Sequence, residues 1–571
     1  MPEQGKTDRS KMIVDKDVPI TVNDGHVLRA NIYRPAAEGR YPVLMAMGIY
    51  GKDVHFADGY RPQWDKLLTL NPNIARNGSS GQYLRWELID PERWVPDGYV
   101  VIAVDSRGSG KSPGYLDPLS SRETQDFHDA IEWAAAQNWS NGKVGLIGIS
   151  YYAIKQWQVA ALRPPHLAAI CPWEGGSDIY RDWSHHGGIF SNVFPEAWLP
   201  RQVLPNQNGN GATPHRDRET GGITTGEPVS PELLVLNRAD HVGDLLEHRL
   251  DDAWYRARSP NLARIEVPLY SAGNWGGAGL HLRGNVEGYL RAGSRQKWLD
   301  MHVGTHFESF YLPRYIERQK KFFAHFLKDE DNGWASEPPI RLEIREPGGV
   351  TVRNEREWPL ARTEWQRFHL NAQERSLSRD TLGSETRADY TALGDGLDFS
   401  TEPFAEATEF TGPLMVRLWV ASTTSDIDIF VSLRMFAPDG TEVVFAGASD
   451  VAPVARGWLR ASHRKLDPAM STAYRPYHAH DEIQKLVPGQ VYPLDVELWP
   501  TSIVFPKGYR MVLTLRGCDL ELGGTPGRIL HNHPSDRPPE EFAGTVTVAS
   551  GPDRESYLLL PLIPAARDAT P

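Results

Sequence analysis

Ser150 has the surroundings that an acyl-transfer nucleophile requires. Residues 144–147 form a continuous apolar run that predicts a buried strand, and residues 151–162 have helical character. Gly148, Ile149 and Ser150 lie on the turn between them. Such a turn raises the serine hydroxyl above the sheet edge and directs the next backbone N–H at the same space. The pattern predicts nucleophilic catalysis by Ser150, although glycine-serine turns between strands and helices also occur without it.

A serine nucleophile needs a histidine base within hydrogen-bond reach, and the base needs a carboxylate to orient it. In the α/β-hydrolase arrangement the histidine comes after the last strand of the sheet. Of the 19 histidines, His306 has this place, because it follows the predicted strand 298–303 and the pair Gly304-Thr305. His302 lies within that strand and is expected to be structural.

The elements that would position these residues alternate between strands and helices. Apolar runs that predict strands occupy residues 42–50, 99–105, 144–147, 166–172, 267–273 and 298–303. Helices are predicted over residues 123–137 and 312–327, and a β-hairpin over residues 12–34. Near-continuous apolar strands that alternate with helices indicate a mostly parallel sheet covered on both faces. The fold class is therefore α/β, with an α/β-hydrolase catalytic domain over residues 1–178 and 263–330.

Two further regions break this alternation. Residues 179–262 hold aromatic, glycine-rich and helix-like segments, including a helical run over 231–257, and are expected to form an inserted helical cap. After a polar, proline-rich linker, residues 331–339, the chain shows short alternating strands separated by turns. This pattern predicts an all-β jelly-roll (β-sandwich) C-terminal domain over residues 340–571. Its predicted strands are residues 340–345, 365–370, 414–422, 427–435, 492–498, 509–515, 544–549 and 556–561.

The composition excludes several classes of partner. The 571 residues carry a net charge of −12 without long runs of one sign, which disfavours nucleic-acid and anionic membrane partners. No apolar window reaches the roughly 18 residues of a membrane helix. The N-terminus has no apolar signal core, so a cytoplasmic protein is expected. The His185-His186 and His531-Asn532-His533 pairs lack further ligands at metal spacing, so no metal or other cofactor is expected.

Several motifs together carry a resemblance to a known family. In the catalytic part they are Asp105-Ser-Arg-Gly-Ser-Gly-Lys-Ser-Pro-Gly114, Trp139-Ser-Asn-Gly-Lys-Val-Gly145, Gly148-Ile-Ser-Tyr-Tyr-Ala153, Gly304-Thr-His306 and Phe322-Phe-Ala-His-Phe-Leu-Lys328. In the C-terminal part they are Gly412-Pro413, Ser425-Asp-Ile-Asp428, Arg456-Gly-Trp-Leu-Arg460 and Pro488-Gly489. Over nearly its whole length the chain resembles the cocaine esterase and X-prolyl dipeptidyl-peptidase group of serine hydrolases. Because this group's turn reads Gly-x-Ser-Tyr, Tyr152 in place of the usual second glycine fits the group.

The resemblance implies an oxyanion hole made of a tyrosine hydroxyl and one backbone N–H. The tyrosine ends the strand that here finishes at Gly48-Ile49-Tyr50, so Tyr50 is the matching residue. The backbone N–H is that of Tyr151, the residue after the nucleophile. These donors would stabilise the charge that develops on the acyl oxygen, and one such donor is worth about 3–4 kcal/mol.

The resemblance also implies an aspartate that this chain lacks. The family's aspartate follows the strand that here is residues 267–273, and the loop after that strand holds no carboxylate. Some α/β-hydrolases take the acid from the loop after the preceding strand, which here contains Glu174 and Asp178. We expect Glu174 to orient His306, because Glu174 lies nearest the strand end. Asp178, Glu308 and a triad without an acid stay open.

The expected substrate is a small-molecule ester, or less favourably an amide, with an apolar or aromatic acyl group. Trp173 and Trp275 flank the proposed site, and Trp183 and His186 are expected on the cap side of its pocket. Esters are favoured because no carboxylate cluster for an N-terminal ammonium follows Ser150. The alternatives are an X-Pro dipeptidyl aminopeptidase or acylase of the same group, and a catalytically weak relative that binds ligands. Whether the chain forms a homo-oligomer stays open.

Overall fold

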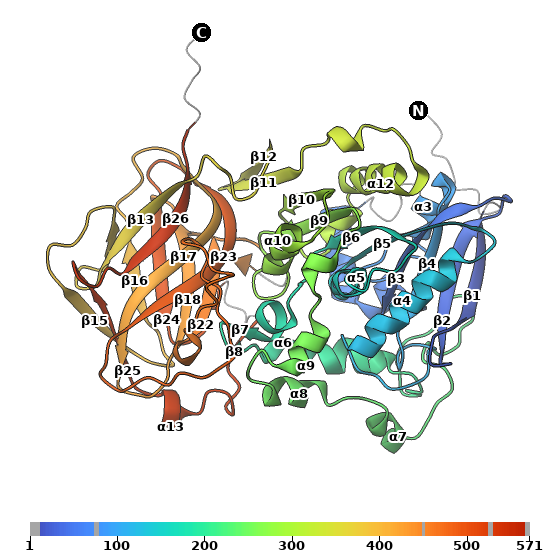
Figure 1. Cartoon of the computed structure of the whole chain (residues 1–571), viewed down its shortest axis with the longest axis horizontal. Coiled ribbons are helices and arrows are strands. Elements are labelled where there is room, and N and C mark those ends of the chain that lie inside the picture. Colours follow the sequence, from blue (N-terminus) through green and yellow to red (C-terminus); the bar gives the residue numbers. More distant parts are fainter. Residues whose placement is uncertain (1–11, 73–78, 448–450, 523–528, 566–571) are drawn as a thin grey trace, which may run out of the picture.

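A computed structural model of the chain describes residues 12–72, 79–447, 451–522 and 529–565. Figure 1 shows two bodies side by side: a sheet covered by helices, and a part built largely of strands, drawn in orange and red. Residues 329–339 join them, between α12 (Pro313–Lys328) and β11 (Ile340–Glu346). In the described ranges, no helix is both long and apolar enough to cross a membrane.

The N-terminal part is organised around one mixed sheet. Its spatial order is β1 (Met12–Thr21), β2 (Val27–Pro35), β4 (Val100–Asp105), β3 (Tyr41–Gly48), β5 (Ser140–Ile149), β6 (Leu167–Trp173), β9 (Leu269–Asn274) and β10 (Lys297–His302). β1 and β2 form an antiparallel hairpin, and the pairs from β4 to β10 are all parallel. The parallel strands bring the residues that follow their carboxyl ends, among them Tyr50, Ser150 and Glu174, to one edge of the sheet.

Helices cover both faces of this sheet, because its central strands are apolar on both faces. Every residue of β4 is buried, and alternate residues point to opposite faces. Val101 and Ala103 share a core with α12, whereas Val100 and Ile102 share one with α4 (Ser121–Ala135), α5 (Tyr151–Ala160) and α10 (Leu282–Arg291). The predicted hairpin, strands and two helices of this part are confirmed, with boundaries moved by a few residues.

The shorter helices of the N-terminal part lie in the connections between its strands and after β10. They are α1 (Phe56–Gly59), α2 (Arg61–Leu70), α3 (Pro91–Trp94), η2 (Val95–Asp97) and α11 (Glu308–Tyr311). Phe56 of α1 packs edge-on against Trp86 and Phe307, so the loops after different strands share one aromatic core. This core carries the residues that line the pocket described below.

The segment between β6 and β9 contains short elements only. They are η3 (Ile179–Ser184), β7 (His185–His186), β8 (Ile189–Phe190), α6 (Val193–Trp198), η4 (Leu199–Val203), η5 (Leu204–Asn206), α7 (Pro231–Leu236), α8 (His241–Glu247), α9 (Ala253–Arg258) and η6 (Leu262–Arg264). The helical run predicted over residues 231–257 is confirmed as helical, but it consists of three short helices. The Asp240 and Asp252 side chains accept hydrogen bonds from the backbone N–H groups of Gly243 and Trp254, so each begins a new helix.

The C-terminal part is largely β, and the strands predicted for it are confirmed. After η7 (Trp334–Ser336) its elements are β11, β12 (Gly349–Glu355), β13 (Glu364–Asn371), β14 (Ser376–Ser378), β15 (Thr386–Thr391), β16 (Leu397–Ser400), β17 (Thr408–Ser422), β18 (Asp428–Phe436), β19 (Glu442–Val443), β20 (Phe445–Ala446), β21 (Val451–Ala452), β22 (Ala455–Arg460), η8 (Ala461–His463), β23 (Tyr492–Phe505), β24 (Arg510–Arg516), α13 (Pro539–Phe542), β25 (Thr545–Ser550) and β26 (Tyr557–Ile563). β17 pairs with β23, β25 and β26, and β18 pairs with β22 and β24. One apolar core contains side chains from both groups of strands.

The segment between β6 and β9 packs tightly against the C-terminal part. The N–H of Arg460 donates to the carbonyl of Gly187 over 2.8 Å, and the guanidinium of Arg181 donates to the carbonyl of His478 over 3.0 Å. Gly187 has φ +57°, and a Cβ there would lie 2.0 Å from the carbonyl oxygen of Trp458. Glycine is therefore required at position 187 both by its backbone conformation and by the neighbouring strand.

We expect Gly187→Ala to destabilise the protein more than Gly221→Ala. Gly221 also has positive φ, +72°, but a Cβ there would meet nothing within 4 Å. The conformational cost, about 1 kcal/mol, is common to both variants, whereas the overlap with Trp458 adds roughly 1–3 kcal/mol for Gly187→Ala alone. Thermal unfolding followed by tryptophan fluorescence measures the difference. Equal midpoints for the two variants would contradict this packing.

Candidate active site

Ser150 occupies a strained turn between β5 and α5. Its backbone has φ 57° and ψ −115°, which is unusual for a residue other than glycine and is typical of functional turns. A Cβ at Gly148 would lie 2.6 Å from the Cβ of Tyr152, and a Cβ at Gly48 would lie 2.6 Å from the ring of Tyr152. The glycines at 48 and 148 therefore make room for Tyr152, the side chain that replaces the usual second glycine.

The backbone around Ser150 is held by the neighbouring strand. The N–H of Ser150 donates to the carbonyls of Trp173, over 3.0 Å, and of Glu174, over 3.1 Å. Tyr151 is the first residue of α5, so its N–H has no acceptor within the helix. The positive end of the helix dipole and this N–H therefore lie next to the Ser150 hydroxyl.

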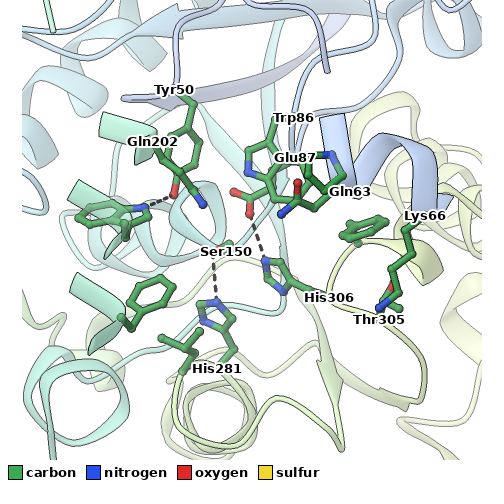
Figure 2. A pocket seen from close by; sticks show the side chains of 15 residues that line it. Tyr50, Gln63, Lys66, Trp86, Glu87, Ser150, Gln202, His281, Thr305 and His306 are labelled. Carbon is green, nitrogen blue, oxygen red and sulfur yellow. Dashed lines mark hydrogen bonds and ion pairs between the residues drawn. The ribbon is translucent and has the colours of Figure 1, made fainter. Parts of the chain in front are cut away.

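Ser150 opens into a pocket at the carboxyl edge of the sheet (Figure 2). The pocket is lined by Tyr50, Pro62, Gln63, Lys66, Trp86, Glu87, Ser150, Phe194, Trp198, Gln202, Leu280, His281, Thr305, His306 and Phe307. Its walls come from the loops after β3, β5, β9 and β10, from the segment before α3, and from α2, α6 and η4. Of the residues predicted to act in catalysis, Tyr50, Ser150 and His306 line this pocket.

Glu174 contacts His306 directly. Its Oε2 lies 2.9 Å from Nδ1 of His306, and its Oε1 lies 3.4 Å from Nδ2 of Asn274 and 3.5 Å from Nε2 of His302. Glu174 is fully buried and has φ 48°, so the chain turns sharply at the end of β6 to place the carboxylate here. Figure 2 shows His306 beside Ser150, with Glu87 on one side and His281 on the other.

The other two carboxylates considered as the acid lie elsewhere. Asp178 accepts the backbone N–H of Arg181 over 3.0 Å and pairs with the guanidinium of Arg181 over 2.9 Å. Oε1 of Glu308 accepts a hydrogen bond from Nδ2 of Asn71 over 3.0 Å. Both carboxylates therefore have structural partners, and Glu174 is the one of the three that contacts His306.

The loop after β9 holds no carboxylate and packs closely against the C-terminal part. A Cβ at Gly276 would lie 2.3 Å from the carbonyl oxygen of Ala446 in β20, so the C-terminal part leaves no room for a side chain there. Asn274 spans this loop, since its Nδ2 donates to the carbonyl of Gly304 over 2.9 Å and its Oδ1 accepts the N–H of Gly276 over 2.8 Å. The side chain of Asn274 thus fixes the loop through hydrogen bonds to two backbone groups.

Glu87 is a second carboxylate on His306 that sequence reasoning missed. Its Oε1 lies 3.1 Å from Nε2 of His306, so the imidazole lies between two carboxylates. Burial lowers the pKa of His306, but Glu174 and Glu87 more than offset this and raise it to about 10. Burial raises the pKa of Glu87 to about 7, against the opposing effect of His306. Glu87 precedes α3 without a recognisable motif, and no sequence signal marks it.

His281, also missed, is the histidine that contacts Ser150. Its Nε2 lies 3.1 Å from Oγ of Ser150, its Nδ1 accepts the N–H of Gly176 over 3.3 Å, and its ring stacks on His306 with centroids 5.2 Å apart. Burial, and then the charge of His306, lower the pKa of His281 well below its usual range. The imidazole is therefore neutral, and with Nδ1 accepting, Nε2 carries the hydrogen and donates to Ser150. The available signal was its place after β9, at the carboxyl edge.

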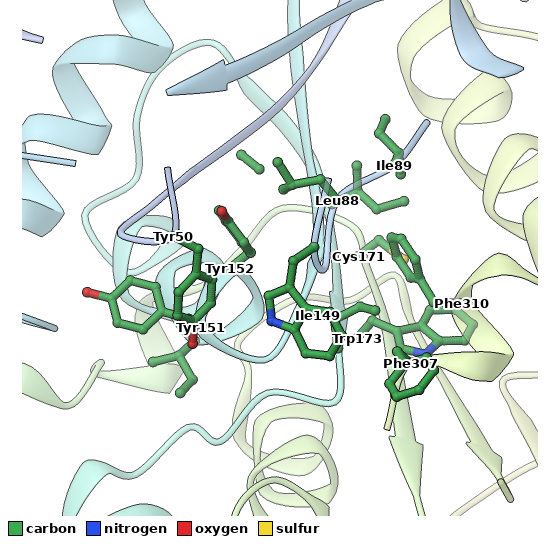
Figure 3. Packing of buried hydrophobic residues seen from close by; sticks show 14 of the residues in the cluster. Tyr50, Leu88, Ile89, Ile149, Tyr151, Tyr152, Cys171, Trp173, Phe307 and Phe310 are labelled. Carbon is green, nitrogen blue, oxygen red and sulfur yellow. The ribbon is translucent and has the colours of Figure 1, made fainter. Parts of the chain in front are cut away.

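Tyr50 has its hydroxyl in the pocket and its ring in the core. The oxygen accepts the indole N–H of Trp198 over 2.9 Å, which leaves the phenol hydrogen to donate to another group. Burial, and then the charge of Glu87, raise the pKa of Tyr50 well above its usual range, so the phenol keeps its proton. Its ring packs edge-on against Tyr151 and Tyr152, as Figure 3 shows.

Trp173 and Trp275, which were expected to bound the pocket, do not line it. Trp173 lies in the core beneath the site, where its indole N–H donates to Oγ of Ser309 over 3.1 Å (Figure 3). The indole N–H of Trp275 donates to the carbonyl of Glu343 over 2.8 Å, against the C-terminal part. Each indole N–H is satisfied away from the pocket, because the rings point into the protein and not toward Ser150.

Trp183 and His186, expected on the cap side, also lie outside the lining. Trp183 packs edge-on behind Phe194 and Trp198, the aromatic side chains that do line the pocket. Nδ1 of His186 lies 2.8 Å from Nε2 of His531, so this residue belongs to the contact with the C-terminal part.

Among the described residues, no group of three or more His, Cys, Asp or Glu side chains could hold a metal ion.

Comparison with known proteins places the chain in a family. Residues 24–308 match the X-Pro dipeptidyl-peptidase (S15) family, and residues 332–559 match the C-terminal non-catalytic domain of X-Pro dipeptidyl-peptidases. The cocaine esterase of a Rhodococcus species is 24% identical over 96% of this chain and 98% of its own. A putative serine esterase of Mycobacterium tuberculosis is 24% identical over 88% of this chain and 90% of its own.

A solved structure gives a stronger match. The crystal structure of a CocE/NonD family hydrolase from Staphylococcus aureus is 32% identical, covers 97% of this chain and 94% of its own, and has a TM-score of 0.82. The resemblance inferred from the sequence motifs is confirmed. The chain belongs to the CocE/NonD and S15 peptidase family of serine hydrolases, with a largely β C-terminal non-catalytic domain.

Proposed function

We propose that the chain is an ester hydrolase that transfers an acyl group first to Ser150 and then to water. The observation that carries the proposal is the 2.9 Å contact between Glu174 and His306 beside the pocket into which Ser150 opens. A carboxylate-bound histidine next to a serine on a strained turn is the arrangement that activates a serine hydroxyl. The likeness to an esterase and a putative serine esterase supports the preference for esters.

In the proposed reaction His306 is the general base and Glu174 the orienting acid. With Nδ1–H donating to Glu174, a neutral His306 has its lone pair on Nε2. That nitrogen takes the proton of Ser150 as the hydroxyl attacks the acyl carbon, and it later returns the proton to the leaving group. Water repeats the sequence on the acyl-enzyme. His281 is a weaker candidate for the base, because its Nδ1 accepts the N–H of Gly176 and its Nε2 therefore carries a hydrogen.

The tetrahedral oxygen would be held by the hydroxyl of Tyr50 and the N–H of Tyr151. The phenol of Tyr50 is fixed by the indole of Trp198, and burial keeps it protonated. Tyr151 begins α5, so its N–H is one of the donors that the helix cannot satisfy internally. Pre-aligned donors in a buried site stabilise the developing negative charge more than they stabilise the neutral ester.

We also propose finer assignments for the two parts of the fold. The strand order β1-β2-β4-β3-β5-β6-β9-β10, with Ser150 after β5, supports an α/β-hydrolase domain over residues 1–178 and 263–330. Phe194 and Trp198 reach the pocket from the inserted segment, which supports a cap over residues 179–262. The antiparallel pairing of β17 and β18 with their neighbours supports a jelly roll over residues 340–571.

The substrate is proposed to be a small molecule with an apolar or aromatic acyl group. Trp86, Phe194, Trp198 and Phe307 supply apolar and aromatic walls to the pocket. X-Pro peptide hydrolysis is the second candidate, because the family match and several putative relatives carry that name. A catalytically weak relative is less well supported, since Glu174 supplies the carboxylate whose absence after β9 favoured that reading.

We expect Glu174→Gln to lower kcat by about 10³–10⁴-fold with the fold intact. Glutamine carries no charge, so it can neither fix the required tautomer of His306 nor stabilise the imidazolium that forms during the reaction. The matched control is Asp178→Asn, which alters the alternative acid. Rates on p-nitrophenyl esters and circular dichroism measure both variants, and a fluorophosphonate probe should label wild-type Ser150. A near-normal rate for Glu174→Gln, or loss of activity only in Asp178→Asn, would contradict the assignment of Glu174 as the orienting acid.

Tyr50→Phe should reduce kcat about 10²–10³-fold while KM changes little, because it removes a donor that acts mainly in the transition state. Tyr60→Phe is the matched control. Tyr60 belongs to the same aromatic cluster, and its hydroxyl has no hydrogen-bond partner among the described residues. If the two variants lose activity equally, packing and not oxyanion binding explains the effect.

Substrate preference separates the two candidate functions. We expect kcat/KM on p-nitrophenyl butyrate to exceed that on X-Pro-p-nitroanilides by about 10²-fold or more, because Trp86, Phe194 and Trp198 give the butyryl chain an aromatic wall. The ratio is measured on the same enzyme preparation, with Ser150→Ala as the blank. A preference for the X-Pro-anilides would replace the esterase assignment with the peptidase one.

A further inference from the structure

Glu87 lies in a segment whose position is fixed against the nucleophile turn. The N–H of Ile149, the residue before Ser150, donates to the carbonyl of Glu87 over 3.1 Å. Glu87 has φ 61°, a conformation that costs a non-glycine residue free energy and persists only where the surrounding structure enforces it. The residue is 2% exposed, and its side chain lines the pocket with Ser150 and His306 (Figure 2). Its placement beside the reacting groups is therefore built into the backbone.

The contacts of Glu87 are not those of a structural carboxylate. Its Oε1 lies 3.1 Å from Nε2 of His306. Its Oε2 has no well-formed hydrogen bond among the described residues, although the indole of Trp86 lies near enough to stabilise the charged carboxylate. A buried carboxylate is costly unless it is paired, and structural ones usually satisfy both oxygens. The contact with His306 is thus the interaction that compensates for burying this charge.

The same contact occupies the nitrogen that catalysis needs. Nδ1 of His306 is bound to Glu174 and Nε2 to Glu87, so the imidazole has no free lone pair to accept the proton of Ser150. Oγ of Ser150 is instead 3.1 Å from Nε2 of His281, which donates to it. The nucleophile and its proposed base are therefore each held by a different neighbour.

We propose that Glu87 is a positioning residue that, while ionised, holds Nε2 of His306 away from Ser150. This inference rests on the proposed role of His306 as the base. One proton transfer releases His306 from Glu87. The Nε2–H bond of the imidazolium breaks, an O–H bond forms on Glu87, and the freed lone pair of Nε2 turns to Ser150. Loss of the Nε2 proton to solvent gives the same free lone pair.

Among the groups that face Glu87, the pair formed by Glu87 and His306 is the one that titrates near neutral and mildly alkaline pH. These groups are His306, Glu174 beyond it, and the phenols Tyr50, Tyr60, Tyr152 and Tyr311. Burial raises the pKa of each of these phenols well above its usual range, so they stay neutral. With a pKa of about 7 for Glu87 and about 10 for His306, the pair shares one proton between these values. Over this range the ionised Glu87 favours the imidazolium, which cannot act as a base.

Glu87→Gln tests the proposal through the pH dependence of kcat/KM, which reports the groups of the free enzyme. Glutamine keeps the shape but not the charge, so the pKa of His306 should fall by at least about one unit. A fall of one unit raises the neutral fraction of His306 at pH 8 about tenfold. In the wild type, kcat/KM should rise with pH as His306 loses its proton. In Glu87→Gln we expect the midpoint of this rise to move to lower pH, and kcat/KM at pH 8 to increase several-fold. Spontaneous ester hydrolysis is subtracted with Ser150→Ala.

Glu308→Gln is the matched control, since Glu308 contacts Asn71 and not His306. It removes one nearby negative charge and should leave the midpoint within about 0.3 unit, because a charge without direct contact is strongly screened. An unchanged or higher midpoint in Glu87→Gln overturns the proposal. If Ser150 is not labelled by the fluorophosphonate probe in the wild type, the proposed function itself fails; labelling with an unchanged midpoint defeats only the role of Glu87.

The wild-type protein supplies an independent test in case Glu87→Gln does not fold. A histidine held between two carboxylates as an imidazolium gives two strongly downfield exchangeable protons in NMR, one on each ring nitrogen. We expect both signals for His306 at pH 8, assigned by their absence in His306→Gln, with loss of the Nε2 signal only at higher pH. A neutral His306 at pH 8 overturns the proposal.

Discussion

The buried contact between Glu174 and His306 ties together the two loops on which the site depends. Glu174 follows β6 and His306 follows β10, and Asn274 at the end of the intervening β9 reaches both, through Oε1 of Glu174 and the carbonyl of Gly304. A carboxylate withdrawn from water is tolerated only when charges and hydrogen bonds replace its hydration. Satisfying Glu174 therefore fixes the direction in which His306 enters the pocket.

The C-terminal part packs closely against the loop after β9, where the family resemblance places the acid. The carbonyl of Ala446 occupies the space that a side chain at Gly276 would need, so position 276 itself cannot carry a carboxylate. Glu174, at the end of the neighbouring β6, contacts Nδ1 of His306 with a backbone φ of 48°. A domain without catalytic groups of its own thus constrains the chemistry of the catalytic one through packing.

Sequence reasoning could predict what depends on strand order, and it could not predict what depends on packing between loops. Ser150 and Glu174 each follow a recognisable apolar run, and the carboxyl ends of parallel strands meet at one edge, so their proximity follows from the order of elements. His281 and Glu87 lie in loops without a periodic pattern, and only their folded positions bring them to Ser150 and His306. Trp173 failed as a pocket residue because closeness in sequence to Glu174 does not determine the face to which a side chain points.

The two stacked histidines show why the protonation states of this site must be considered together. His306 is positively charged because two carboxylates face it, and its charge is one of the causes that keep His281 neutral. A neutral His281 with Nδ1 bound to Gly176 has one hydrogen to give, and it gives that hydrogen to Ser150. If His306 loses its proton, that repulsion disappears and His281 becomes easier to protonate. The charges of Glu87 and Glu174 thus act on the charge of His306, and the charge of His306 acts on the hydrogen bond between His281 and Ser150.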